Sequence, residues 1–494
     1  MAGIGIKLSK IFGKETITTN LLGFGYSTMV TVAPMFVIIG NILLMSYFLR
    51  FDITGYKGRN LFAATILYIF IFSLLASSPY NAVISRYLSD VIYDETYDDI
   101  LPCYYTGLGV TILTASVMGI PFCIWERVVG KVALYYVFTG YCGFIALVLV
   151  FYSMLYLSIC KDYSKISIFF FTGMLVAFLL AFLFVKGYHM EVSYGMLLSL
   201  TIGFAVTAIM EMATIRRYFR RNNNSYRKVL GYFKRYWKLI VINFAYTLGL
   251  YIHNFVFWNT KLRMVVVDSF VMAPTYDVAT CIAMFTNISA TVIFIARIEM
   301  YFHDRYKAYS EAVTGGRWMD VQNTKNRMFR QLSTELMNLV RLQFIISVVI
   351  FLIMLIFLPR FGFAGLVLQI YPSLAAGYFI LFVMYSEIIL LYYYNDLDGA
   401  VVTAVTFCLV TFLVSLIATH FSAIWYGLGV IIGSLTGFVI AYLRLRWVER
   451  HLDEHIFCRG VLFPTKYAPK PSTIVFDRYK LQGNEGVDEK VMTS

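Results

Sequence analysis

Long uninterrupted runs of apolar residues recur along the whole chain. Each run is about 20 residues or longer, which is the length a helix needs to cross the hydrocarbon core of a bilayer. The strands of a membrane barrel would instead show segments of about ten residues with alternating polarity. The pattern therefore predicts about twelve transmembrane helices. They lie within residues 21–49, 60–80, 100–124, 132–160, 166–185, 192–215, 239–260, 270–296, 336–358, 370–394, 399–420 and 423–443.

The amino-acid composition supports the same class. Of the 494 residues, 60% are hydrophobic and 14% are charged, whereas soluble domains contain roughly 45 to 50% apolar and about 25% charged residues. We therefore expect an all-α integral membrane protein. Its seven cysteines show no paired spacing, so neither a disulfide framework nor a zinc site is indicated. Thiols buried among the membrane spans are the simpler interpretation.

The basic residues are distributed unevenly between the two sides of the membrane. With a cytoplasmic N-terminus, 32 of the 41 Lys and Arg residues fall on the cytoplasmic side. Positive residues mark that side of a membrane protein, so both termini are expected to face the cytoplasm. The formal net charge of +13 then reflects topology and contact with the anionic inner leaflet, and we expect no binding of nucleic acid.

A basic connection near the midpoint of the chain divides the spans into two sets of six. A second long cytoplasmic connection, 297–335, is expected to continue the eighth span as a helix and to turn at Gly315 and Gly316. It is interpreted as an interfacial helix or as a docking surface for a partner. The expected parts are an N-terminal six-helix bundle over 1–215, a basic cytoplasmic connector over 216–238, a C-terminal six-helix bundle over 239–447, and a partly disordered cytoplasmic tail over 448–494.

Polar residues line one face of four predicted spans. Residues three or four apart share a helix face. Lipid offers polar groups no partners, so such faces should contact protein or a water-filled path. Hydrogen bonds between packed helices are the alternative interpretation. The candidate path residues are Thr31, Asn41, Asn243, Thr247, His253, Asn254, Asp277, Asn287 and Glu387.

Glu387 lies within the apolar run LFVMYSEIILLYYY, residues 381–394. An ionised carboxylate near the bilayer centre costs on the order of 2.5 to 3.5 kcal/mol on insertion scales, so an unpaired charge there requires a use or a partner. The sequence leaves three roles open for it: lining or proton coupling in a path, a structural hydrogen bond, or a position near the cytoplasmic interface. Glu211 lies closer to a predicted span boundary and is interpreted as interfacial.

The sequence shows no constellation of residues typical of an enzyme. A Ser-His-Asp order, a P-loop and a dinucleotide fingerprint are missing, so we expect a transporter with no cofactor and no metal. Asp396 and Asp398 have the spacing with which glycosyltransferases hold a metal and a sugar nucleotide, but a simple turn between two spans is expected. The two His residues of HLDEH, 451–455, lack a third zinc ligand. The acidic run DETYDD, 94–99, is expected to form a solvated loop.

Aromatic residues are unusually abundant, with 38 Tyr and 43 Phe. Belts of aromatic side chains at the two membrane surfaces are the ordinary explanation. Flat ring faces along a path, suited to stacking on sugar rings, are the alternative.

Four segments in a fixed order resemble the Pel exopolysaccharide transporter family, PelG. That family belongs to the polysaccharide-exporter branch of the multidrug/oligosaccharidyl-lipid/polysaccharide (MOP) superfamily. The segments are MAGIGIKLSKIF at the start, SRYLSDVIYDETYDDILPCYYTGL after the second span, VIFIARIEMYFHDRYKAYSEAV after the eighth, and LLYYYNDLDGA before the eleventh. The resemblance extends from residue 1 to about residue 447, and it implies a MOP/MATE-like fold of two six-helix bundles.

This resemblance implies a multi-pass protein of the bacterial cytoplasmic membrane that helps export a growing Pel-type polymer, rich in N-acetylgalactosamine, for the biofilm matrix. The implied partners are a cytoplasmic PelF-like glycosyltransferase, PelD- and PelE-like membrane proteins, the polysaccharide and the lipid bilayer. The likeness also places the first, seventh and eighth spans at a central cleft. Alternatives that stay open are a flippase of the same fold for lipid-linked sugars or small molecules, and a scaffold or glycosyltransferase component of a polysaccharide synthase.

Overall fold

Helices make up nearly all of the described chain, which in this computed structural model comprises residues 34, 36–51, 55–160, 162–287, 300–360, 362 and 365–452. Three short turns of other helix types, η2, η3 and η5, and two short strands complete the elements. In chain order the elements are a helix Phe36–Phe48, α3 Tyr56–Tyr93, η2 Tyr97–Asp99, α4 Ile100–Val128, α5 Leu134–Ile159, α6 Tyr163–Phe182, η3 Leu183–Gly187, α7 Val192–Tyr218, α8 Tyr226–Arg235, α9 Trp237–Phe257, β1 Met264–Val266, β2 Phe270–Met272, α10 Pro274–Asn287, α12 Met300–Gly315, α13 Trp318–Arg360, α14 Leu366–Tyr393, α15 Leu397–Ala418, η5 Ala423–Trp425 and α16 Leu428–Arg450.

Ten helices of the described chain are long and apolar enough to cross a membrane. They correspond to ten of the twelve predicted spans. The other two, predicted within 21–49 and 270–296, extend into residues outside the described part of the chain. The predicted class, an all-α membrane protein, is confirmed. Such helices suit lipid because their backbone groups are hydrogen-bonded within each segment.

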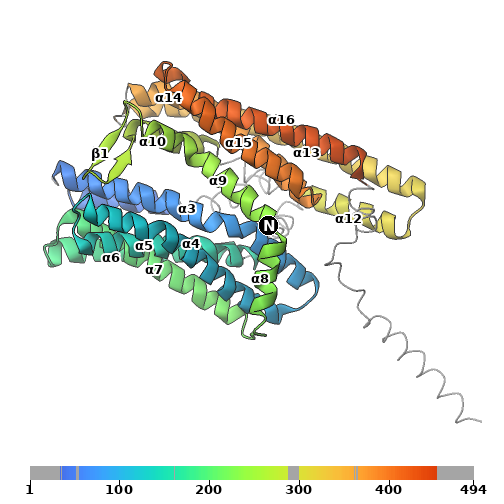
Figure 1. Cartoon of the computed structure of the whole chain (residues 1–494), viewed down its shortest axis with the longest axis horizontal. Coiled ribbons are helices and arrows are strands. Elements are labelled where there is room, and N and C mark those ends of the chain that lie inside the picture. Colours follow the sequence, from blue (N-terminus) through green and yellow to red (C-terminus); the bar gives the residue numbers. More distant parts are fainter. Residues whose placement is uncertain are drawn as a thin grey trace, which may run out of the picture.

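The helices pack as two groups, here called the N-lobe and the C-lobe. The N-lobe contains α3 to α7 and the helix Phe36–Phe48, which contacts α6 through Asn41 and Phe48. The C-lobe contains α9, α10 and α12 to α16. Figure 1 shows the N-lobe in blue to green and the C-lobe in light green to red, with α9 running beside α3 where the lobes meet. The pair α3 and α9 is therefore the centre of the contact between the lobes.

Buried polar groups inside the lobes are largely paired. In the N-lobe, Tyr104, Tyr152 and Tyr156 are fully buried. The Tyr152 hydroxyl donates to the Tyr104 carbonyl at 2.8 Å, and the Tyr104 hydroxyl lies 2.9 Å from the Ser153 hydroxyl. Buried hydroxyls that keep a partner avoid most of the cost of leaving water. These bonds join α4 to α5 within the N-lobe.

The basic connector contains a helix that the sequence analysis did not predict. This helix, α8, packs against α3 and α4 of the N-lobe before the chain enters α9. Val229 and Phe233 are its buried residues. They are four positions apart and therefore share one helix face. The connector is thus a short amphipathic helix that lies on the N-lobe and leads directly into the C-lobe.

A β-hairpin stands where the eighth span was predicted to begin at residue 270. Strands β1 and β2 pair antiparallel, with Val265 opposite Val271. Val267 and Asp268 in the turn have positive φ angles of 52° and 55°, a region that side chains other than Gly rarely adopt. Helix α10 starts only at Pro274, because Pro suits the first position of a helix. The predicted start of this span was therefore wrong by a few residues.

Two helices are much longer than the bilayer is thick. Helix α3 has 38 residues and α13 has 43, whereas about 20 residues cross the hydrocarbon core. Helix α3 continues without a break through residues 81–93, which were predicted to lie in a connection. Helix α12 ends at Gly315 and α13 packs back against it, which confirms the predicted turn. The α12–α13 pair therefore extends away from the body of the C-lobe (Figure 1).

Candidate functional site

Aromatic rings close one end of the interface between the lobes, here called the hairpin end. Tyr68 of α3 stacks on Trp258, which follows α9, with ring centroids 5.1 Å apart and an interplanar angle of 10°. One helical turn further along α3, Phe72 stacks on Phe255 at 6.0 Å. The Tyr68 hydroxyl also donates to the Val271 carbonyl at 2.9 Å and accepts from the Val271 N–H at 3.2 Å. The hairpin end is thus held by ring stacking and by the backbone of β2.

Charged and polar contacts of the connector mark the opposite end, here called the connector end. Asp99 accepts hydrogen bonds from Lys228 at 2.7 Å and from Ser225 at 2.7 Å. Tyr232 of α8 donates to Asp90 of α3 at 2.5 Å. Asp99 is only 3% exposed, so the prediction of a solvated loop for 94–99 is wrong for this residue. Its burial is compensated by hydrogen bonds from the basic connector.

Arg86 joins the two lobes directly at the connector end. Its guanidinium donates to the Asn395 side-chain oxygen at 2.8 Å, across from α3 to the turn between α14 and α15. The same guanidinium lies 4.4 Å from the ring centroid of Tyr236, a cation–π distance. Contacts between the lobes are therefore present at both ends of the α3–α9 pair.

Asp277 organises the junction between the hairpin and α10. It accepts hydrogen bonds from the Asn254 amide at 2.8 Å, from the Trp258 indole at 2.9 Å, and from the Ala273 backbone N–H at 3.0 Å. The last bond satisfies a backbone donor beside the start of α10. Asn254 also donates to Thr280 at 3.4 Å. The structure thus brings together Asn254 and Asp277, two of the candidate path residues.

His253 lies beside this cluster but faces the interior of the C-lobe. Its Nδ1 is 2.8 Å from the Tyr276 hydroxyl, and its Nε2 is 3.2 Å from the Tyr378 hydroxyl. The Tyr378 hydroxyl also donates to the Leu250 carbonyl at 3.2 Å. His253 is only 1% exposed, so its ring nitrogens contact these two hydroxyls instead of solvent. The imidazole therefore joins α9 to α10 and α14.

Asn287 forms a second polar junction, deeper along α10. Its amide donates to the Ala375 carbonyl at 3.0 Å, and its side-chain oxygen accepts from the Ser347 hydroxyl at 2.7 Å. Gln343 in turn donates to Ser347 at 2.8 Å. All of these side chains are buried. Asn287 therefore links α10, α13 and α14, which is the interhelical role weighed as the alternative for such residues.

The remaining polar candidates of the first and seventh spans lie apart from these junctions. Asn41 contacts the Met174 sulfur of α6 at 3.6 Å, inside the N-lobe. Asn243 donates to the Leu239 carbonyl of its own helix at 3.1 Å, and Thr247 is buried in α9. Thr31 lies outside the described residues. The structure does not bring these residues into one site, and their assignment to a path stays a prediction.

The carboxylates of Glu211 and Glu387 are buried, and neither has a hydrogen-bond partner among the described residues. Glu387 is 3% exposed and lines a cavity of about 490 Å³ between α13, α14 and α16, at the edge of the C-lobe away from α3. Arg330 and Arg446 line the same cavity. Glu211, interpreted as interfacial from the sequence, is 0% exposed within the N-lobe. Neither carboxylate lies at the contact between the lobes.

Asp396 and Asp398 lie where a simple turn joins α14 to α15, as predicted: Asp396 precedes α15 and Asp398 is in its first turn. Asp396 caps α15 by accepting from the Gly399 N–H at 3.2 Å, and it forms an ion pair with Arg444 at 2.5 Å. Asp398 pairs with Lys238 at 2.5 Å. Both carboxylates are therefore engaged in structural contacts. In the part of the chain that the structure describes, no three His, Cys, Asp or Glu residues are grouped as metal ligands.

Sequence analysis missed the contacts that join the lobes. The rings of Tyr68 and Trp258 stack on each other although these residues are far apart in the sequence. Lys228 and Asp99 form an ion pair between the connector and the N-lobe, again between positions far apart in the sequence. The available signals were the aromatic excess and the opposite charges of 94–99 and the connector, but neither signal specifies a partner. The contacts at the lobe interface could therefore be identified only from the structure, and not from the sequence.

Asp277→Ala is expected to destabilise the protein by about 1 to 3 kcal/mol, because three buried donors lose their acceptor. Thermal unfolding of the purified protein in detergent, followed by tryptophan fluorescence, should show a lower midpoint. Asp94→Ala changes the same residue type at an exposed position and should leave the midpoint unchanged. An equal shift for both variants would contradict the bonding role of Asp277.

Comparison with known proteins identifies the family. A model of the family PelG, described as "Putative exopolysaccharide Exporter (EPS-E)", matches residues 1–457. The chain belongs to the PelG family. A comparison with curated proteins finds no match. The predicted resemblance to PelG is thereby confirmed over the described lobes.

Solved structures similar to this PelG-family chain are transporters of the MOP superfamily. An outward-facing multidrug resistance MATE family transporter is 11% identical, with a TM-score of 0.59, 87% of this chain and 96% of that chain covered. An inward-facing MATE transporter is also 11% identical, with a TM-score of 0.57. The match covers 91% of this chain and 99% of that chain. A MOP superfamily transporter from Pyrococcus furiosus is 11% identical, with a TM-score of 0.58. The match covers 87% of this chain and 96% of that chain. At this identity the likeness establishes the fold.

Proposed function

We propose that this protein is the inner-membrane subunit that moves a growing Pel-type polysaccharide, rich in N-acetylgalactosamine, out of the cytoplasm for the biofilm matrix. The observation that carries the proposal is the match of the exopolysaccharide exporter family to residues 1–457. The two-lobed MOP-type helical fold supports a transport role. In this role the protein carries out no covalent chemistry of its own.

The contacts between the lobes suggest how passage is controlled. In the described chain the lobes touch at the hairpin end through Tyr68 and Trp258, and at the connector end through Arg86 and Asn395. Rings and single hydrogen bonds can separate without breaking the core of either lobe. Similar folds have been solved in outward-facing and inward-facing states. We infer that the two ends open in turn, so that the polymer path is never open to both sides at once.

The distribution of charge supports the orientation of this path. Most Lys and Arg residues fall in the connector and the other segments predicted to be cytoplasmic, which supports a cytoplasmic position for the connector end. The hairpin end then faces outward. A cytoplasmic PelF-like glycosyltransferase, with PelD- and PelE-like membrane proteins, would deliver the polymer at the connector end. Polar side chains such as Asn254 and Asp277 lie near the outward end of the route.

The proposal is tested with inside-out membrane vesicles that contain this protein. The vesicles receive the cytoplasmic synthase and labelled sugar nucleotide, and a glycosidase is added to the outside. Export should make most of the labelled polymer resistant to the glycosidase, because it enters the vesicle lumen. Vesicles without the protein should leave the polymer sensitive.

Three other outcomes would contradict export by this chain. Equal protection with and without the protein would show that another component carries the polymer. Polymer made without added synthase would favour a membrane-embedded glycosyltransferase. If vesicles without the protein lose the synthase from the membrane but otherwise still export polymer, a scaffold role would be favoured. Each outcome is read from the same labelled product and a blot for the synthase.

A further inference from the structure

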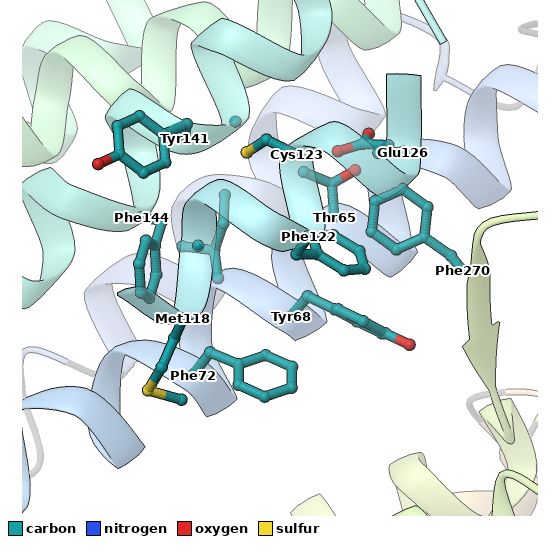
Figure 2. A pocket seen from close by; sticks show the side chains of 13 residues that line it. Thr65, Tyr68, Phe72, Met118, Phe122, Cys123, Glu126, Tyr141, Phe144 and Phe270 are labelled. Carbon is teal, nitrogen blue, oxygen red and sulfur yellow. The ribbon is translucent and has the colours of Figure 1, made fainter. Parts of the chain in front are cut away.

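An aromatic cavity of about 370 Å³ lies at the hairpin end of the N-lobe. Its walls come from α3, α4, α5 and β2, and Figure 2 shows the side chains that line it. This volume is within the range of small-molecule sites. Most of the lining is apolar. The aromatic rings in the lining are those of Tyr68, Phe72, Phe122, Tyr141, Phe144 and Phe270.

One carboxylate, that of Glu126, is placed among these rings. Glu126 lies in the last turn of α4 and is only 5% exposed. Among the described residues, none donates a hydrogen bond to its carboxylate and none forms an ion pair with it. The Thr65 hydroxyl, another polar group of the lining, donates to the Leu61 carbonyl at 2.7 Å and lies 3.2 Å from the Tyr136 hydroxyl. Figure 2 shows the Glu126 carboxylate as part of the cavity lining.

An unpaired carboxylate in an apolar cavity is costly, because burial removes its hydration without supplying a counter-charge. Aromatic ring faces carry negative electrostatic potential and attract cations. A carboxylate and several ring faces around one cavity therefore favour the same kind of group, a positive charge on an organic molecule. A neutral ligand would leave the carboxylate unpaired.

We propose that this cavity binds a ligand that carries an organic ammonium group, held between the Glu126 carboxylate and the aromatic rings. The inference does not depend on the proposed export function. Two sources share this chemistry: a sugar unit with a free amine, and a small quaternary amine such as choline. Tyr68 and Phe270 line the cavity, and Tyr68 also stacks on Trp258 of the other lobe, so the ligand lies directly behind the hairpin-end contact.

The test measures binding to the purified full-length protein in detergent by isothermal titration calorimetry. The probes are choline and glucosamine. Their neutral controls are the isostere of choline in which carbon replaces the nitrogen, and N-acetylglucosamine. At least one amine should bind, and its neutral control should bind at least ten times more weakly. The amine that binds identifies the source: choline for quaternary amines, glucosamine for amino sugars.

Glu126→Gln keeps the size of the side chain and removes its charge. We expect it to weaken binding of the amine at least tenfold and to leave binding of the neutral control unchanged. Glu191→Gln, at an exposed position before α7, should bind as the unmodified protein does. If Glu126→Gln fails to fold, the proposal is tested by comparing the binding of each amine with that of its neutral control in the unmodified protein. Equal binding of charged and neutral probes, or no binding of either amine, would overturn the proposal.

Discussion

Cross-linking position 72 to position 255 is expected to reduce export at least tenfold. Phe72 and Phe255 stack with ring centroids 6.0 Å apart, one in each lobe. If the lobes must part at the hairpin end to release polymer, a covalent link there holds the path closed. The experiment uses Phe72→Cys with Phe255→Cys in a chain whose seven native cysteines are replaced. A short bis-methanethiosulfonate reagent forms the link, and glycosidase protection in inside-out vesicles measures export.

The control is a link of similar length within one lobe. Tyr246 of α9 and Tyr385 of α14 stack at 4.5 Å inside the C-lobe, so cross-linking cysteines at these positions should leave export unchanged. Dithiothreitol should restore export in the 72/255 variant, because it cleaves the link. Full export by the cross-linked 72/255 protein would show that polymer leaves without separation of the lobes at this end.

The membrane spans could be predicted because lipid imposes a simple rule. A segment in hydrocarbon must satisfy its backbone internally and present apolar side chains, so each span is visible as a long apolar run. Ten of the predicted spans are helices of suitable length and composition. The Gly315–Gly316 turn was also predictable, since polar residues and glycines interrupt the pattern there.

The β-hairpin could not be predicted because its turn lacks the usual signal. Hairpins with tight turns are recognised by Asn-Gly or Asp-Gly pairs, which adopt positive φ at low cost. Here Val267 and Asp268 occupy those conformations. Strands of three residues are also too short to show alternation. The apolar run was therefore assigned to the start of a span.

The polar residues show a different limit of the sequence. A stripe of Asn, His and Thr on a helix looks the same whether it faces a water-filled path or another helix. In the structure His253 lies between Tyr276 and Tyr378, and Asn287 bonds to α14 and α13. Their partners lie many residues away in sequence. Periodicity fixes which residues share a face, but only the packing of the lobes fixes what that face meets.

Gly433→Leu is expected to prevent the C-lobe from packing. Gly429, Gly433 and Gly437 recur every fourth residue on one face of α16. This face packs against α15, and a side-chain carbon at Gly433 would overlap the Thr411 hydroxyl and lie 3.0 Å from the Thr411 Cα. At Gly429 the same carbon would overlap the Ser415 hydroxyl. Small residues at such spacing let membrane helices approach closely, so a leucine forces them apart.

The expected result is at least a tenfold fall in folded protein in the membrane, since inserting extra methylenes into a well-packed core costs about 1 to 3 kcal/mol. Fluorescence-detected size-exclusion chromatography of detergent extracts measures the folded fraction. Gly109→Leu is the matched control, because nothing lies within 4 Å of a side-chain carbon built there in α4, and its yield should match the unmodified protein. Normal yield of Gly433→Leu would mean that α15 and α16 tolerate a wider separation, and that the glycine face is not what holds these two helices together.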